Sequence, residues 1–159
     1  MSIQGALFRQ VAGSFATGVT IVMTGRGGES RGLTASSFAS LSLDPQLVLV
    51  CVDREANTLP VLRETGHFSI NILGTGQQGL SQKFASKSLS AHEKMIDVEY
   101  RLASSGIPVL SEAIAFFECR MALEYEGGDH VILVGEVIDG GLGSESPPLV
   151  YFRGGYQSP

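Results

Sequence analysis

Residues 32–45 read GLTASSFASLSLDP, and this stretch decides how the chain is interpreted. Residues 34–42 carry five hydroxyl side chains, and the apolar run 47–52 follows shortly afterwards. Hydroxyl-rich sequence is typical of loops, but the large apolar side chains interleaved here predict that the segment is held against a core. A fixed row of hydroxyl and backbone N–H groups beside a packed sheet suits a polar ligand that needs many hydrogen bonds.

The size and composition predict one globular domain, residues 1–159, with a proper core. Hydrophobic residues make up 43% and charged residues 17%, which excludes a disordered chain and suggests some surface buried against another subunit. The net charge of −5 argues against nucleic acid and anionic membrane partners. No apolar run is long enough to span a bilayer, and no secretory signal is visible. Cys51 and Cys119 lie in apolar segments and are interpreted as buried thiols in a reducing cytoplasm.

The hydrophobic pattern predicts a mainly β chain. Residues 7–15 repeat at helical spacing, and the period then changes to two. Strands are expected at 19–24, 31–38, 47–52, 68–72, 119–125, 131–138 and 149–152, with short helices at 57–64 and around 80–84. Residues 86–110 are polar and predict an irregular surface excursion. Because turns rather than long helices join the strands, an antiparallel barrel or sandwich with a few peripheral helices is favoured over a doubly wound parallel sheet.

Three motif-based alternatives lack support. Residues 74–79 match GxGxxG between a strand and a helix, but no Val/Ile-rich second strand follows that helix, so a glycine-rich turn is the better interpretation. The histidines His67, His92 and His130 are far apart in sequence and no CxxC pair exists, so no metal site is expected. The sequence contains no GxSxG elbow, so a serine hydrolase is not indicated.

Two side chains have both an ordinary and a functional interpretation. His130 follows a hairpin turn and is either an exposed turn residue or a ligand contact at the rim of the sheet. Lys83, beside Ser81 on a short helix, is either solvated or a phosphate clamp near a helix N-terminus. Glu118 and Glu124 lie on the predicted solvent-facing side of a strand and form no acid–base pair. This suits hydride transfer between cofactors, in which the protein mainly positions two rings.

An ordered set of blocks resembles the short-chain flavin reductases, the small reductase components of two-component flavin-dependent monooxygenases. The blocks are residues 15–22 (FATGVTIV), 32–42 (GLTASSFASLS), 44–48 (DPQLV), 68–73 (FSINIL), 80–85 (LSQKFA), 128–130 (GDH) and 151–156 (YFRGGY). The resemblance covers nearly the whole chain. It implies an antiparallel, FMN-binding split β-barrel of Greek-key type and a homodimer.

The resemblance also implies an activity and a site. The activity is reduction of FMN or FAD by NADH or NADPH, followed by release of reduced flavin to a separate oxygenase component. Flavin contacts are implied for Thr34, Ala35, Ser36, Ser37, Ser40, Leu41, Ser42, Cys51, Val52 and Asp53, with Asn57, Thr58, Ser81, Gln82, Lys83 and Phe84 toward its phosphate. His130 and Tyr156 are the implied contacts of the nicotinamide nucleotide.

Two other functions stay open at this point. One is a related flavoprotein that retains its flavin and reduces another substrate, and the other is a non-catalytic flavin-binding protein. The residues do not separate FMN from FAD. They do not separate NADH from NADPH either, because no arginine can be assigned to a 2′-phosphate.

Overall fold

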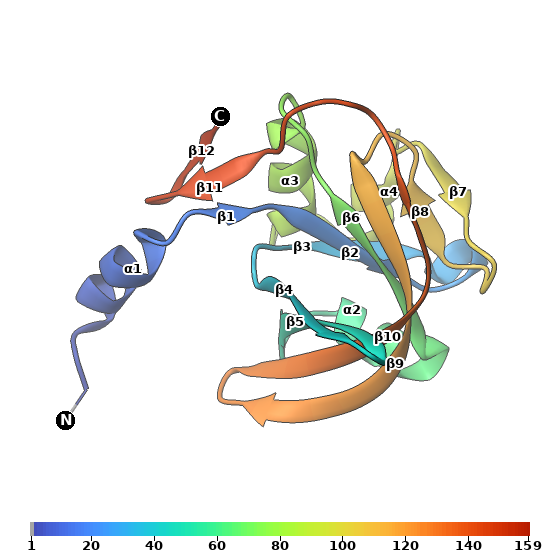
Figure 1. Cartoon of the computed structure of the whole chain (residues 1–159), viewed down its shortest axis with the longest axis horizontal. Helices are drawn as coiled ribbons and strands as arrows, with labels where there is room; N and C mark the ends of the chain where they lie inside the picture. Colours follow the sequence, from blue (N-terminus) through green and yellow to red (C-terminus); the bar gives the residue numbers. More distant parts are fainter. Residues whose placement is uncertain (1) are drawn as a thin grey trace.

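Seven strands form the main sheet of the structure, a computed structural model that describes residues 2–159 (Figure 1). In order across the sheet they are β3 (Arg31–Ala35), β2 (Thr20–Thr24), β6 (His67–Ile72), β9 (Ala115–Gly127), β10 (His130–Leu142), β5 (Gln46–Asp53) and β4 (Phe38–Leu43). Two small sheets consist of β1 (Thr17–Gly18), β11 (Val150–Phe152) and β12 (Gly155–Gln157), and of β7 (Tyr100–Leu102) and β8 (Pro108–Leu110). Every ladder among these strands is antiparallel, so the expected mainly β, antiparallel class is confirmed.

The two edge strands of the main sheet, β3 and β4, are consecutive in the chain and are separated only by Ser36 and Ser37. The sequence predicted one strand over residues 31–38. Instead the chain turns at these two serines and continues as a second strand, and within residues 2–159 no ladder joins the two edges. The Ser37 hydroxyl donates to the carbonyl of Cys51 (3.0 Å) and accepts from its N–H (3.2 Å). This side chain therefore supplies β5 with the partner that a neighbouring backbone would otherwise provide.

The core lies where the two halves of the sheet face each other. Val22, Phe68, Val50 and Leu133, from strands on both halves, are fully buried in one cluster. Gly135 is required there, because a Cβ atom at this position would lie 2.6 Å from the Phe68 ring. A second buried cluster joins β2 to the helix that follows β6.

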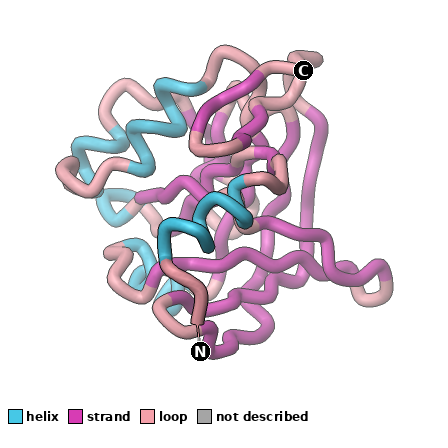
Figure 2. The backbone as a smooth tube through the Cα atoms, turned by 90° about the vertical axis from the view of Figure 1, so that its left-hand side faces the viewer, coloured by secondary structure: helices cyan, strands magenta, loops and turns pink. Residues whose placement is uncertain are grey.

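Helices lie on the outside of the strands (Figure 2). They are α1 (Gly5–Gly13), α2 (Thr58–Thr65), α3 (Gln78–Ala85) and α4 (Ala91–Met95), with a 3₁₀ turn at Gly27–Glu29. Helix α2 buries Leu59 and Leu62 and ends at Gly66, whose φ of 69° lies in the left-handed region. Helix α1 projects from the body (Figure 1), and none of its residues is buried. No helix within residues 2–159 has the length and apolar character needed to cross a bilayer.

The GxGxxG segment leads from β6 into α3, as its position in the sequence predicted. The next strand along the chain, β7, belongs to a different sheet and pairs only with β8 among the described residues. Setting the dinucleotide fingerprint aside was therefore correct, since that fingerprint needs a parallel βαβ unit.

The prediction of an irregular excursion over residues 86–110 was wrong. This region contains α4, β7 and β8, and Ile107, Val109 and Leu110 are buried. Helix α4 begins with a capping box, in which Ser90 and Glu93 each bind the other's backbone N–H. The region forms an outer layer over the main sheet.

Buried polar side chains hold this outer layer in place. The Asn71 amide donates to the Ile21 carbonyl and accepts from the N–H of Leu110, each at 2.9 Å. The Ser69 hydroxyl donates to the Pro108 carbonyl at 2.7 Å. Asn71 and Ser69 are completely buried, so these bonds form without competition from water.

Glu118 belongs to the same polar layer, and its predicted place on a solvent-facing side of β9 was wrong. Its side chain is completely buried and accepts hydrogen bonds from the Ser104 hydroxyl and the Ser105 N–H. Burial alone raises the pKa of Glu118, but these hydrogen bonds outweigh burial and keep the pKa below its ordinary value. Strand alternation did not reveal that a second layer covers this face of β9. It also does not hold along the whole strand, because a register shift skips Ala122 in the pairing with β10, and Leu123 and Tyr125 are 49% and 52% exposed.

Candidate functional site

A pocket of about 560 Å³ lies where the β3–β4 link, the end of β5, the start of α2, residues 84–94 and the tip of the β9–β10 hairpin meet. It brings together ten of the residues expected at the site. These are Thr34, Ala35, Ser36, Ser37, Cys51, Asp53, Asn57, Thr58, Phe84 and His130. The hydroxyl-rich segment is thus one wall of a real hollow, although the elements that supply the other walls are far apart in sequence.

The hydroxyls of this wall are not all available to a ligand. Thr34 Oγ1 donates to the carbonyl of Ser81 at 2.6 Å, and the Ser37 hydroxyl is occupied by the backbone of Cys51. Ser36 is exposed, and its hydroxyl has no hydrogen-bond partner among the described residues. Ligand contacts on this wall would therefore come from Ser36 and from backbone groups.

The pocket does not include the other eight expected residues. These are Ser40, Leu41, Ser42, Val52, Ser81, Gln82, Lys83 and Tyr156. Ser40 and Leu41 are exposed on the edge strand β4, whereas Val52 faces the core. Ser81 is buried, and its hydroxyl lies 2.8 Å from the Tyr156 hydroxyl, so this pair supports the wall from behind through Thr34.

Lys83 is not near a helix N-terminus, contrary to the arrangement expected for a phosphate clamp. It lies in the last turn of α3, and its ammonium group donates to the carbonyl of Ile96. A cation is favourable at this end of a helix, where carbonyl groups lack partners.

The lysines that do line the pocket are Lys87 and Lys94, which the sequence did not single out. Lys94 Nζ donates to the Phe84 carbonyl at 3.1 Å, and partial burial lowers the pKa of Lys94. Helix α4 places Lys94 there by packing against β3. Local sequence carries no signal for that contact, because it depends on how residues 86–95 fold back over the sheet.

His130 lines the pocket from the first position of β10. Its Nδ1 lies 2.7 Å from a carboxylate oxygen of Asp129, and its side chain is 43% exposed. Because an ionised carboxylate only accepts hydrogen bonds, Nδ1 of the imidazole carries the proton of this bond. This imidazole is held by a neighbour while part of it stays accessible, which the ordinary interpretation of a free turn residue did not predict.

The side chains that line the pocket are suited to binding a polar ligand. Its wall offers donors, two ammonium groups and an imidazole. It also has two acidic residues, Asp53 and Glu55, and the Asp53 carboxylate accepts from the N–H of Glu55 at 2.8 Å, which closes a local turn. Within residues 2–159, no three His, Cys, Asp or Glu side chains lie together in a way that would hold a metal ion.

The two cysteines are predicted to differ sharply in reactivity. Cys51 is half-buried and lines the pocket, whereas Cys119 is buried and burial, aided by the nearby Glu118 charge, raises its pKa to about 12. The thiolate is the reactive form, so N-ethylmaleimide near neutral pH should modify Cys51 alone, giving a single adduct by mass spectrometry. A Cys51→Ser variant should take up none while folded, and modification of Cys119 in the folded protein would contradict the prediction.

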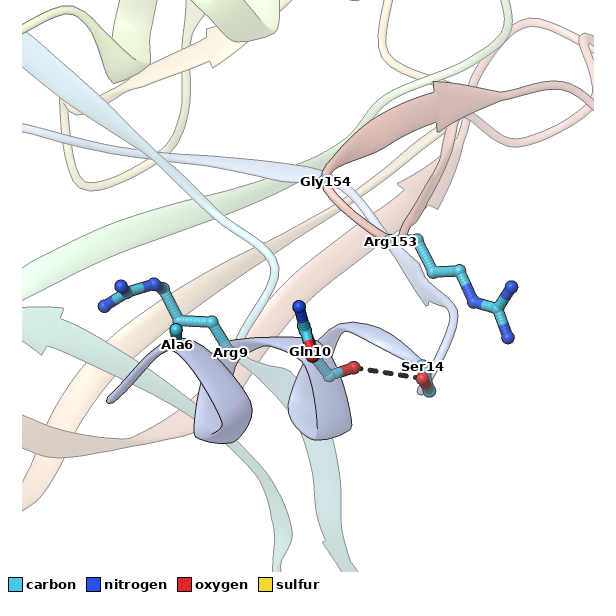
Figure 3. Close-up of a pocket in the computed structure, with 6 residues that line it drawn as sticks. All are labelled: Ala6, Arg9, Gln10, Ser14, Arg153 and Gly154. Carbon is cyan, nitrogen blue, oxygen red and sulfur yellow. Dashed lines mark hydrogen bonds between the residues drawn. The ribbon is translucent and has the colours of Figure 1, made fainter. Parts of the chain in front are cut away.

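A second hollow, of about 580 Å³, lies between α1 and the β11–β12 turn and is lined by Ala6, Arg9, Gln10, Ser14, Arg153 and Gly154. The Arg153 N–H donates to the carbonyl of Gly13 at 2.8 Å, which attaches the turn to the end of α1. Figure 3 shows the Arg9 and Arg153 side chains pointing in opposite directions. The two guanidinium groups therefore do not converge on one anion.

Most of the chain matches one protein family. Residues 12–159 match the flavin reductase like domain, and the chain therefore belongs to that family. This agrees with the resemblance drawn from the sequence blocks and confirms it.

Individual relatives cover almost all of the chain. The reductase component of 4-hydroxyphenylacetate 3-monooxygenase from Thermus thermophilus is 41% identical over 94% of this chain and 93% of its own length. A flavin reductase (NADH) from Kitasatospora aureofaciens is 39% identical over 97% of this chain and 81% of its own. Among solved structures, the NADH:FAD oxidoreductase SgcE6 of Streptomyces globisporus, in complex with NAD and FAD fragments, has a TM-score of 0.88 and 37% identity. That match covers 96% of this chain and 90% of SgcE6.

Proposed function

We propose that this chain is an NAD(P)H:flavin oxidoreductase, which transfers hydride from NADH or NADPH to FMN or FAD. The observation that carries the proposal is the pocket beside residues 34–37, with its lysines and its oriented imidazole, in a chain of the flavin reductase family. When bound, the nicotinamide and the flavin supply the redox chemistry. The protein's part is to hold the two rings together and to exclude water between them.

The pocket residues suit a flavin phosphate at one end. A volume of about 560 Å³ falls within the roughly 300–1,000 Å³ typical of cofactor sites. An anion beside Lys94 would restore the stabilisation of its charge that burial removes. We assign the phosphate end to Lys94, Lys87 and Ser86, with Asn57 and Thr58 at the start of α2.

His130 is the proposed contact of the nicotinamide nucleotide, because it lines the pocket from a different element than the lysines and has an accessible imidazole. Tyr156, the other expected nucleotide contact, stays a prediction, as do flavin contacts from Ser40, Leu41, Ser42, Val52, Gln82 and Lys83. Ser81 is proposed to act on the flavin only through Thr34.

We further propose that the sheet is a split barrel of Greek-key type in a single domain, residues 1–159, and that two chains form a homodimer. The separation of β3 from β4 at the serine link supports the split. Helix α1 supports the dimer, since Leu7, Phe8 and Val11 on it are 49%, 61% and 62% exposed, and Phe15 just beyond it is 78% exposed. Apolar surface of this extent typically marks an interface.

A separate oxygenase component is the proposed receiver of reduced flavin, and the cytoplasm stays the predicted compartment.

The decisive experiment is a steady-state matrix of NADH and NADPH against FMN, FAD and riboflavin with purified protein. Nucleotide oxidation should start on addition of free flavin and continue over many turnovers. Absence of turnover with both nucleotides and all three flavins would overturn the proposal. A yellow colour retained through gel filtration, with no gain in rate from added flavin, would favour a flavoprotein that keeps its cofactor.

Lys94→Met tests the phosphate end of the pocket. Loss of a charge-assisted hydrogen bond to phosphate should raise the KM for FMN about tenfold and leave the KM for riboflavin unchanged, because riboflavin has no phosphate. Lys83→Met is the matched comparison, since it removes the same charge from a side chain outside the pocket. If Lys83→Met raises the KM for FMN and Lys94→Met does not, the phosphate lies at Lys83 and the assignment to Lys94 is wrong.

A further inference from the structure

Arg54 attaches the tip of the β9–β10 hairpin to the end of β5. Its backbone N–H donates to the Asp129 carbonyl at 3.0 Å, and its Nε donates to the Gly128 carbonyl at 2.6 Å. The guanidinium group also forms an ion pair with Glu126 on β9. One residue thus contacts β9 and both residues of the turn that joins the two strands.

Little else holds this tip. The closed end of the hairpin reaches past the other strands (Figure 1), and residues 125–129 are all exposed. Gly128 adopts a φ of 73°, in the left-handed region that favours glycine. Glycine has no side chain that could pack against the rest of the protein. The first fully buried residue of β10 is Val131. Apart from strand pairing, the position of the turn therefore depends on the polar contacts of Arg54.

The turn at residues 128–129 also sets the orientation of His130. The backbone N–H of residue 54 binds the Asp129 carbonyl, and the Arg54 side chain binds the carbonyl of the preceding residue, Gly128. The Asp129 carboxylate accepts from Nδ1 of the imidazole. His130 is also paired in register with Asp53, the residue before Arg54. Arg54 itself does not line the pocket, so its effect on a ligand has to pass through the turn.

We propose that Arg54 is a positioning residue, which sets the affinity for the nicotinamide nucleotide by holding the turn that presents His130 to the pocket. This inference rests on the proposed function, in which His130 contacts the nucleotide. The flavin end of the pocket, at Lys94 and α2, lies on other elements and does not depend on Arg54.

The test compares Arg54→Met with Arg63→Met. Each variant removes one guanidinium group that pairs with a glutamate of β9, but Arg63 pairs with Glu124 and makes no hydrogen bond to the turn. Arg54→Met should raise the KM for NADH about tenfold while kcat and the dissociation constant of FMN stay within about twofold. Arg63→Met should leave all three within about twofold. An equal KM for NADH in the two variants would overturn the inference.

Hydrogen exchange gives a readout that does not depend on catalysis. The amide of residue 54, which donates to the Asp129 carbonyl, should lose protection in Arg54→Met and keep it in Arg63→Met. Unchanged exchange in Arg54→Met would overturn the positioning role whether or not the protein oxidises NADH. Faster exchange in a protein without nucleotide oxidation would leave the positioning role standing and refute the proposed function instead.

Two further variants separate charge from geometry. Arg54→Lys keeps the positive charge but loses the planar guanidinium group that binds the Gly128 carbonyl and Glu126 together, so it should retain most of the defect. Glu126→Gln removes only the ion pair, which is exposed, and should behave as the wild type does. Full rescue by lysine would overturn a role based on holding the turn.

Discussion

Replacing Cys51 with tryptophan is expected to weaken FMN binding at least 100-fold, or about 2.7 kcal/mol. The Cys51 side chain lines the proposed flavin pocket, and an indole in its place would fill space that the ring system needs. The fold should survive, because Ser37 binds only the backbone N–H and carbonyl of residue 51. Quenching of flavin fluorescence measures the dissociation constant.

Cys51→Ala is the control for this variant, since it removes the thiol and leaves the space. Its FMN affinity should lie within about threefold of the wild type, because a small apolar contact contributes little. A tryptophan variant that binds FMN as tightly as the alanine variant would show that flavin does not occupy this pocket.

Asn71→Leu is expected to lower the free energy of unfolding by about 3 kcal/mol or more. The amide is completely buried and makes three hydrogen bonds, to the Ile21 carbonyl, the Ser69 hydroxyl and the Leu110 N–H, each 2.9 Å long. Leucine has a similar volume but satisfies none of these groups, and each unpaired buried group costs about 1–3 kcal/mol. Urea unfolding followed by circular dichroism gives the value.

The matched control is Asn57→Leu, the same substitution at an exposed site where the side chain caps nothing. Its free energy of unfolding should change by less than about 0.5 kcal/mol. If Asn71→Leu stays within about 1 kcal/mol of the wild type, the polar layer does not anchor residues 107–110 to the sheet.

Sequence pattern predicted those parts of the fold in which one face is apolar. Residues 19–24, 47–52 and 68–72 alternate or run apolar, and all three are strands. β4 was missed because its hydroxyls are typical of a loop, and it is an edge strand with little to bury. β8 was missed because three residues carry no period, and its burial depends on Ser69 and Asn71, which lie almost 40 positions earlier.

Prediction of the site likewise depended on whether its residues are continuous in the sequence. The wall formed by residues 34–37 was predictable, because a continuous segment carries it. Lys94 was not, because its place in the pocket arises from α4 packing against β3. Lys83 was favoured instead because it lies beside Ser81 in sequence, although the two side chains face different partners. Proximity along a helix does not reveal which side of it faces the pocket.

The internal use of the Thr34 and Ser37 hydroxyls bears on how long a flavin stays bound. These groups look ready to grip a ligand, yet each is already committed to the protein's own backbone. The ring system would then rest on a rigid wall with few side-chain bonds to break when it leaves, while the phosphate end provides most of the hold. A brief residence time is what a carrier needs when it must load a molecule, reduce it and hand it on intact in every cycle.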